Sequence, residues 1–262
     1  MRFEHLLVED SDRIRTITLN RPGKLNSWNG AMREEMARVF SDTAADPDLR
    51  ALIITGAGRG FSAGEDVSEM ADLTGIGTRG FRAVARGIHS VFDQIEAMEI
   101  PVIAAVNGVA AGGGFELALS CDFRVMDPAA RFVMPEVKVG LIPGSGGCSR
   151  LVRHVGLGRA KELVMLSRSV GAEEATALGL ATSVAAAGGA VAGATELAAQ
   201  LACQAPLALG MAKIVLNTCT DVDQETGRRL ERLGQSVLKT TSDHAEGARA
   251  FVEKRAPNWE GR

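Results

Sequence analysis

Two glutamates lie in apolar, glycine-rich parts of this chain, where carboxyl groups could carry acid–base chemistry. Glu116 stands three residues after Gly113 in NGVAAGGGFELALSCDF, residues 107–123, and Glu136 stands in RFVMPEVKVGLIPGSGG, residues 131–147. Apolar surroundings can separate the pKa values of two carboxyl groups, which leaves one as a proton donor and the other as a base. Taken singly, each also has an ordinary explanation: Glu116 as the cap of its own helix start, and Glu136 as an exposed carboxylate at a strand end.

The three consecutive glycines, residues 112–114, predict a second chemical feature beside Glu116. Glycines at a helix start let the backbone approach a ligand closely, and the first N–H groups of a helix have no partner within the helix. The N–H of Gly113 or of its neighbour could therefore bind a negative charge that develops during a reaction. Glu116 follows one helical turn later, so it should face the same side.

A third glycine-rich stretch, ITGAGRGFSAGED at residues 54–66, resembles only half of a dinucleotide-binding fingerprint. Its third glycine is misplaced, no clear helix follows, and no acidic residue ends a second strand about 20 residues later, as that fingerprint requires. The pattern argues against nicotinamide binding. A loop after a strand is the simpler interpretation.

The elements that must position these residues alternate between strand and helix. Apolar, β-branched or alternating runs predict strands at residues 13–20, 51–56, 101–108, 122–127 and 131–136. Helical spacing predicts helices at residues 30–46, 79–98, 112–121, 146–155, 158–168 and 172–178. This alternation indicates an α/β fold.

The chain changes character towards its C-terminus, because nearly everything from Ala190 onward has helical spacing. Asp221 and Ser242 stand where the N-caps of two of these helices are expected, and Pro206 stands at a first-turn position. We therefore predict two parts. An α/β core over residues 1–199 should contain the active site, and a helical region should occupy residues 200–262.

Composition argues against several classes of protein. The 262 residues are 46% hydrophobic, and 29 basic residues nearly balance 32 acidic ones, for a formal charge of −3. No basic block suggests nucleic acid or anionic lipid as a partner. The charged start lacks the apolar segment of a signal peptide, and the longest uncharged run, residues 175–195, has few large apolar side chains, so no membrane span is expected.

The four cysteines and four histidines predict neither a disulfide framework nor a metal site. The cysteines form no CxxC pair, which is typical of reduced thiols in a cytoplasmic protein. No histidine lies within five residues of another histidine or of a cysteine, so no metal ligands follow from spacing.

Taken together, these stretches resemble the enoyl-CoA hydratase/isomerase (crotonase) family over the whole chain. The matching segments stand in family order: LNSWNGAMREEM near the start, GRGFSAGEDVSEM at 58–70, PVIAAVNGVAAGGGFELALSCD at 101–122, RFVMPEVKVGLIPGSGG at 131–147 and EGARAFVEKRAP at 246–257. The resemblance implies a core of right-handed ββα spiral turns. It also implies that the C-terminal helical region assembles the chain into a homo-oligomer, a trimer or a hexamer.

Site residues carry over from the family one at a time. The resemblance implies an oxyanion hole made by the backbone N–H groups of Glu65, which follows the glycine of FSAGE, and Gly113. It implies that Glu116 and Glu136 are the paired catalytic glutamates of the hydratase subgroup. It also implies substrate or CoA contacts at Ala63, Asp66, Arg59, Gly112, Gly144 and Lys254. Ser68 stands near the place where family members often carry a CoA-binding lysine, so Arg59, or Lys254 of a neighbouring subunit, would supply the charge.

The implied reaction is syn addition of water across the double bond of a 2-enoyl-CoA thioester. Neither a metal nor a redox cofactor is expected, since CoA arrives as part of the substrate. Two alternatives remain open: another crotonase-type reaction such as Δ3,Δ2-enoyl-CoA isomerisation, and a non-catalytic acyl-CoA-binding protein of the same fold. The chain has no tyrosine, which argues against family branches that use a catalytic tyrosine.

Overall fold

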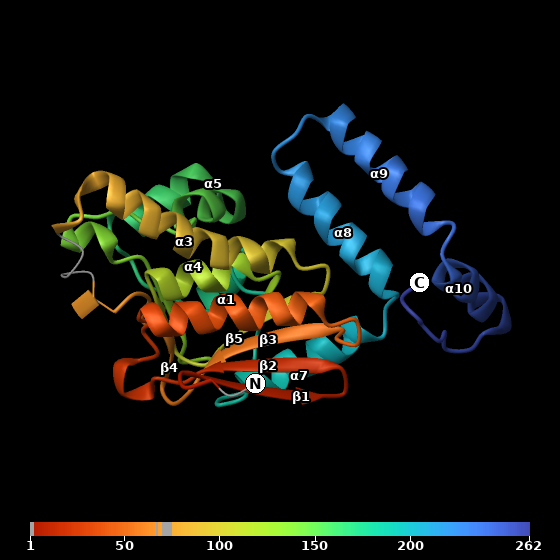
Figure 1. The fold of residues 1–262 in the computed structure, drawn as a ribbon, viewed down its shortest axis with the longest axis horizontal. Coiled ribbons are helices and arrows are strands. Elements are labelled where there is room, and N and C mark those ends of the chain that lie inside the picture. Colours follow the sequence, from red (N-terminus) through yellow and green to blue (C-terminus); the bar gives the residue numbers. More distant parts are fainter. Residues whose placement is uncertain (1–2, 67, 70–74) are drawn as a thin grey trace.

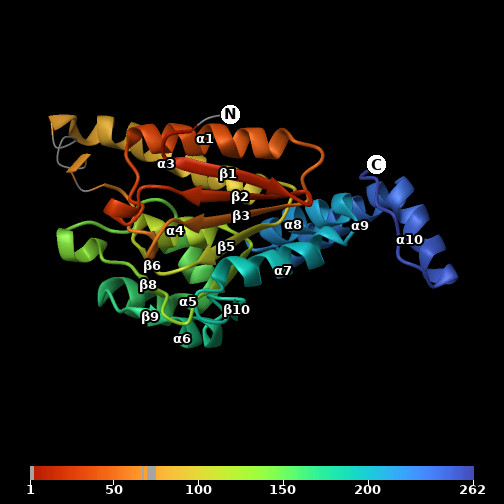
Figure 2. The same ribbon diagram turned by 90° about the horizontal axis from the view of Figure 1, so that it is seen from below.

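A computed structural model describes residues 3–66, 68–69 and 75–262 of the chain. Val67 and Met70 of the motif at residues 58–70 lie outside this description. Two β-sheets and the helices around them form the core of the protein (Figure 1). Three further helices extend from one end of the core in both views (Figures 1 and 2).

The larger sheet has six strands in the order β1-β2-β3-β5-β7-β10. These are β1 (Leu6–Ser11), β2 (Ile14–Leu19), β3 (Ala51–Gly56), β5 (Val102–Val106), β7 (Phe123–Met126) and β10 (Ser183–Val184). Strands β1 and β2 are antiparallel and the other pairs are parallel. Parallel strands buried on both faces are apolar throughout, which explains the ALIITG of β3, whose six residues are all buried.

Helices cover both faces of this sheet. Helices α1 (Gly30–Ala45) and α3 (Gly77–Ala97) contribute large apolar side chains to the core on one face. Helix α7 (Ala190–Ala202) packs against the other face, and Figure 2 shows the sheet between α1 and α7. The small side chains that let α7 lie close to the sheet are Ala190, Ala194 and Ala198.

The smaller sheet positions the candidate site. Its order is β4-β6-β8-β9, with β4 (Gly60–Ser62), β6 (Val109–Ala111), β8 (Arg131–Val133) and β9 (Val170–Gly171). The chain passes from the large sheet to the small one three times, from β3 to β4, from β5 to β6 and from β7 to β8. This repeated path, with helices between the turns, is the ββα spiral that the resemblance implies.

Because β4, β6 and β8 are parallel neighbours, their carboxyl ends meet at one edge of the small sheet. The segment 63–66 follows β4. Helix α4 (Gly113–Ser120) follows β6, and the 3₁₀ helix η3 (Glu136–Val139) follows β8. Three stretches that are far apart in the sequence therefore come together at this edge.

The predicted helices and strands are confirmed with local differences. The helices predicted at 146–155 and 158–168 form one element, α5 (Gly147–Met165), which bends at Gly156, where φ is 73°. Strand β1 was not predicted, because its sequence LLVEDS has too few apolar residues to show the alternation of a half-buried strand. The shortest remaining elements are η1 (Pro22–Lys24) and α6 (Ala172–Ala177).

The C-terminal helices are α8 (Pro206–Cys219), α9 (Gln224–Leu238) and α10 (Ser242–Glu253), called here the arm. Pro206 begins α8 as predicted. The N-caps of α9 and α10 are Asp223 and Thr241, so the predictions of Asp221 and Ser242 were wrong by one or two residues. The reason is local geometry: Asp223 and Thr241 have extended backbone and accept hydrogen bonds from the first free N–H groups of their helices through side-chain oxygens.

One buried ion pair attaches the arm to the core. Lys213 of α8 reaches Asp122 at 2.8 Å and also donates to the carbonyl oxygens of Ile95 and Ile100. The predicted boundary between residues 199 and 200 falls inside α7, whose apolar face packs on the sheet. Within the described ranges, no single helix has the length and apolarity to cross a membrane, while α7 and α8 meet that test only as a pair bent by 108°.

Candidate active site

The backbone N–H groups of Gly113 and Glu65 lie at the edge of the small sheet. Gly112 is the N-cap of α4, and Gly113 is the first residue inside the helix. Among the described residues, no acceptor takes the N–H of Gly113 or of Glu65. A Cβ added at Gly64 would lie 2.8 Å from the nitrogen of Gly113, so the two segments pack backbone against backbone. This arrangement leaves two neighbouring donors available to an anionic oxygen.

The three glycines that open α4 are required for three different reasons. Gly112 has φ +52°, and an added Cβ would lie 2.9 Å from Oε1 of Glu136. A Cβ at Gly113 would lie 2.5 Å from Cζ2 of the buried Trp28. A Cβ at Gly114 would collide with the carbonyl oxygen of Ser62 in β4. The triple glycine therefore allows α4 to begin between β4, the Trp28 ring and the Glu136 carboxylate.

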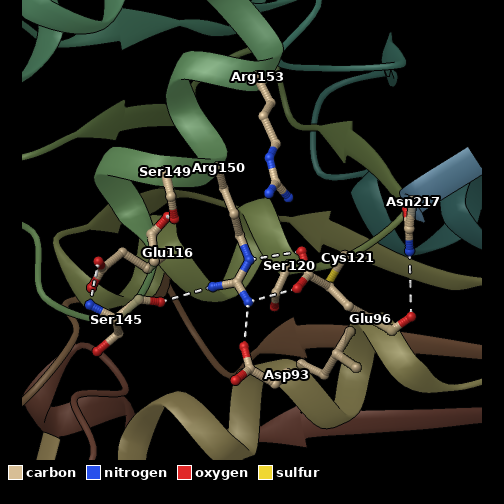
Figure 3. Close-up of polar contacts among 12 residues, drawn as sticks. Asp93, Glu96, Glu116, Ser120, Cys121, Ser145, Ser149, Arg150, Arg153 and Asn217 are labelled. Atoms are coloured by element: carbon tan, nitrogen blue, oxygen red, sulfur yellow. Dashed lines mark hydrogen bonds and ion pairs between the residues drawn. The ribbon is translucent and has the colours of Figure 1, made fainter. Parts of the chain in front are cut away.

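Glu116 is buried in the first turn of α4, with 3% of its surface exposed. Its Oε1 accepts from the N–H groups of Ser145 and Gly147, each at 2.7 Å (Figure 3 draws the bond from Ser145). Burial raises the pKa of Glu116, and these two bonds, together with the charge of Arg150, act in the opposite direction. The hydrogen bonds of the Glu116 side chain come from Ser145 and Gly147, outside α4. Capping of its own helix therefore does not account for this carboxylate.

Glu136 begins η3, three residues after the last residue of β8, and is half-buried. Its Oε1 lies beside Gly112, and its Oε2 is buried without a hydrogen-bond partner among the described residues. Burial raises the pKa of Glu136 to about 7, and the charge of Glu116 adds to this rise. A buried carboxylate oxygen without a partner is costly in a structural role, and a pKa near neutrality suits a proton donor.

The remaining residues of the loop after β4 are held by structural contacts. The Glu65 carboxylate pairs with Arg33 of α1 at 2.7 Å, so it is directed towards α1. Burial raises the pKa of Glu65, and the charge of Arg33 opposes this. Asp66 is buried and pairs with Arg21 at 3.2 Å. Ala63 donates its N–H to the carbonyl of Leu25.

The predicted CoA contacts are not gathered at one place in the chain. Arg59 is exposed in the turn between β3 and β4. Gly144 is exposed, and its carbonyl oxygen contacts Nε2 of His89 on α3. Lys254 is exposed and is the C-cap of α10. Helix α10 lies at the end of the arm away from α4 (Figures 1 and 2). Of the six predicted contacts, Ala63, Asp66 and Gly112 lie on the site segments themselves, and Arg59 and Gly144 lie close to them in sequence.

Several residues that shape the site were not assigned a role from the sequence. Trp28 packs its ring against Gly113, and its backbone pairs with Glu65 in a β-bridge. Ser145 and Gly147 hold Glu116 through backbone N–H groups, and a backbone donor does not by itself select a side chain. The glycines of IPGSGG were the available signal, because a glycine-rich turn before a helix exposes N–H groups. Across the described ranges, no three His, Cys, Asp or Glu side chains are placed to hold a metal ion.

Comparisons with known proteins agree over nearly the whole chain. Residues 9–262 match the family described as enoyl-CoA hydratase/isomerase. The chain is 37% identical over 256 residues to the short-chain-enoyl-CoA hydratase of Clostridium acetobutylicum, with 97% of each chain covered. It is 36% identical over 260 residues to the crotonyl-CoA hydratase of Syntrophomonas wolfei, with 99% of each covered. The crystal structure of an enoyl-CoA hydratase from Bacillus anthracis, 35% identical, is similar at a TM-score of 0.94 and covers 99% of this chain and 100% of that one. The chain therefore belongs to the enoyl-CoA hydratase/isomerase family and has the crotonase fold.

Proposed function

We propose that this enzyme hydrates a 2-enoyl-CoA thioester to a 3-hydroxyacyl-CoA. The pair of glutamates carries the proposal. Glu116 and Glu136 lie at the same edge as the N–H groups of Gly113 and Glu65, for which the described part of the chain offers no acceptor. A protein that only bound acyl-CoA would gain nothing from burying Oε2 of Glu136, which has no hydrogen-bond partner among the described residues. A role in acid–base catalysis explains why the protein buries that oxygen.

In the proposed reaction, the thioester carbonyl oxygen accepts hydrogen bonds from the N–H groups of Glu65 and Gly113. Glu116, ionised and held by two N–H donors, takes a proton from water as the water oxygen bonds to the β-carbon. The electron pair of the double bond moves towards the thioester, whose oxygen carries negative charge against the two donors. The α-carbon then takes the proton of Glu136, so one hydrogen and one hydroxyl group have been added.

The carboxylates then hold one proton between them as before, now on Glu116 instead of Glu136. No metal or redox cofactor takes part in the proposed steps. Arg59, Gly144 and the segment around Ala63 border the proposed substrate site. Lys254 would reach CoA phosphates only from a neighbouring subunit, since it caps α10, the helix that lies at the end of the arm away from α4 (Figure 1).

A panel of acyl-CoA thioesters tests the proposed function. Incubation with 2-enoyl-CoA substrates should remove the absorbance of the conjugated double bond and produce 3-hydroxyacyl-CoA, identified by mass spectrometry. Isomerisation of a 3-enoyl-CoA would instead create that absorbance without a change in mass. That alternative is supported by Glu136 alone, because one group with a pKa of about 7 can both remove and return a proton. Appearance of the isomer without any hydration would contradict the proposal.

We expect a bell-shaped pH dependence of kcat/KM, with the falling alkaline limb near pH 7. The pair must carry one proton, and its last proton leaves as the pH rises through the raised pKa of Glu136, about 7. Hydration and dehydration use the same singly protonated pair, so the pH dependence of kcat/KM should be the same in both directions. Initial rates in both directions between pH 5 and 9 check this. A profile that is flat to pH 9 would contradict the role of Glu136 as donor.

The proposal includes assembly of the enzyme into trimers or hexamers in the cytoplasm. Large apolar side chains of the arm are exposed on the single chain, namely Leu216, Leu233, Val237, Phe251 and Val252. Such a concentration of exposed apolar surface is typical of a contact between subunits.

Removal of the arm should therefore lower the oligomeric state or the solubility of the protein. A chain that ends at Gln204 keeps α7 on the sheet and removes α8 to α10. Light scattering after size-exclusion chromatography measures the mass. The full-length Phe251→Glu variant tests the same surface without deleting any element, since it places a charge at a residue that is 86% exposed. A truncated protein with the oligomeric state of the full chain would contradict this prediction.

A further inference from the structure

The turn formed by residues 145–147, which holds Glu116, is itself held from behind by a buried arginine. Arg150 of α5 donates from Nη1 to the carbonyl oxygen of Ser145 at 2.8 Å (Figure 3). The guanidinium also packs against Gly146, where φ is +96° and an added Cβ would collide with Nη1. Ser145 thus faces the arginine with its carbonyl and Glu116 with its N–H.

The Arg150 guanidinium is fixed by two carboxylates of α3. Its Nε and Nη2 donate to Glu96, each at 2.8 Å, and Nη2 also donates to Asp93 at 2.8 Å. The Arg150 side chain is 7% exposed, against 35% for Glu96 and 64% for Asp93. A planar fork with five N–H donors can satisfy both α3 and the turn at once, which a single ammonium group cannot do.

We propose that Arg150 is a positioning residue, which locks turn 145–147 to α3 so that the turn's two N–H groups hold the Glu116 carboxylate in its working orientation. The inference rests on the proposed function, in which Glu116 activates water. A purely structural ion pair would explain the contacts to Asp93 and Glu96, yet it would not require the bond to the Ser145 carbonyl. That bond joins the ion network to the carboxylate in two steps, from Arg150 to Ser145 and from Ser145 to Glu116.

The charged and titratable groups that face Glu116 come from three elements besides its own. They are His89 on α3, Glu136 on η3, and Cys148 and Arg150 on α5. The N–H bonds of the turn favour the charged form of Glu116 and therefore lower its pKa against the effect of burial. Loosening the turn should raise the pKa of Glu116, and so should loss of the arginine charge. The Arg150→Lys variant separates these causes, because it keeps the charge and loses the fork.

The experiment compares Arg150→Gln and Arg150→Lys with wild type and with Arg153→Gln. Arg153 lies three residues further along α5 and pairs with the exposed Asp221. Among the described residues, its side chain has no hydrogen bond or ion pair with the turn. We expect kcat for hydration to fall about 10²-fold in Arg150→Gln, as small displacements of a catalytic group can cost, with KM little changed. Arg150→Lys should show a smaller loss in the same direction, and Arg153→Gln should match wild type.

Infrared titration supplies a readout that does not depend on activity. The carboxyl band that disappears in Glu116→Gln identifies Glu116, and its midpoint should move to higher pH in both Arg150 variants. Unchanged kcat, an unchanged midpoint, or an equal loss in Arg153→Gln would each overturn the inference. If the wild-type protein hydrates no enoyl-CoA but the midpoint still shifts in the Arg150 variants, the positioning role is supported and the proposed function is rejected. Should Arg150→Gln fail to fold by circular dichroism, the Lys variant decides by the same criteria.

Discussion

Replacement of Glu136 by glutamine should lower kcat for hydration by roughly 10²–10⁴-fold, the range expected for loss of a general acid. Glutamine keeps the size of the side chain beside Gly112, but its amide protons are far too weakly acidic to be donated to the α-carbon. Because Oε2 of Glu136 has no partner among the described residues, the substitution breaks no internal hydrogen bond there. Affinity for the thioester should therefore change little, and steady-state rates with isothermal binding measurements check both quantities.

Glu116→Gln should cause a loss in the same range for a different reason. Its amide cannot accept the proton of the attacking water, although an amide oxygen can still accept from Ser145 and Gly147. If the two carboxylates act as one unit, the double variant should be little worse than the poorer single variant. If the loss in the double variant equals the product of the two single losses, the two residues act independently. Near wild-type turnover by either single variant would exclude that residue from the mechanism.

Removal of the Gly113 N–H should lower kcat by about 10²–10³-fold, or roughly 2.7–4 kcal/mol, as for other single oxyanion donors. Side-chain substitution is a poor way to test this. Alanine at Gly113 would push its Cβ into Trp28, away from the donor itself. Replacing the glycine by glycolic acid, which turns the peptide bond into an ester, removes the N–H and adds no atoms. Circular dichroism, thermal melts and turnover on one sample separate a loss of chemistry from a loss of fold.

The same ester replacement at Gly114 is a matched control. Each ester weakens one carbonyl acceptor in the first turn of α4, where Gly112 accepts from Phe115 and Glu116. The effect on helix stability should therefore be similar at the two positions, whereas only the Gly113 N–H is assigned to the thioester oxygen. Equal turnover by the Gly113 and Gly114 esters would contradict the oxyanion role.

The sequence determined the elements well wherever burial imposes a regular pattern. The apolar run of β3 and the helical spacing of α1 and α3 predicted their bounds to within about two residues, because a buried strand or helix face must exclude polar side chains. Short strands such as β4, β6 and β9 have too few residues to establish a period. Only their pairing in the small sheet identifies them.

The sequence also showed which residues could do chemistry, since glycines and a glutamate in apolar surroundings are costly unless they are used. It could not show how the three glycines differ, because Trp28, Ser62 and Glu136 reach them from distant parts of the chain. The partners of Glu116 were hidden for a similar reason, since backbone N–H groups are common to nearly every residue. Arg150 looks like any charged residue on a helix until α3 and turn 145–147 enclose it. Local composition thus fixed the candidates, and tertiary packing, which sets distances between remote segments, decided what each one contacts.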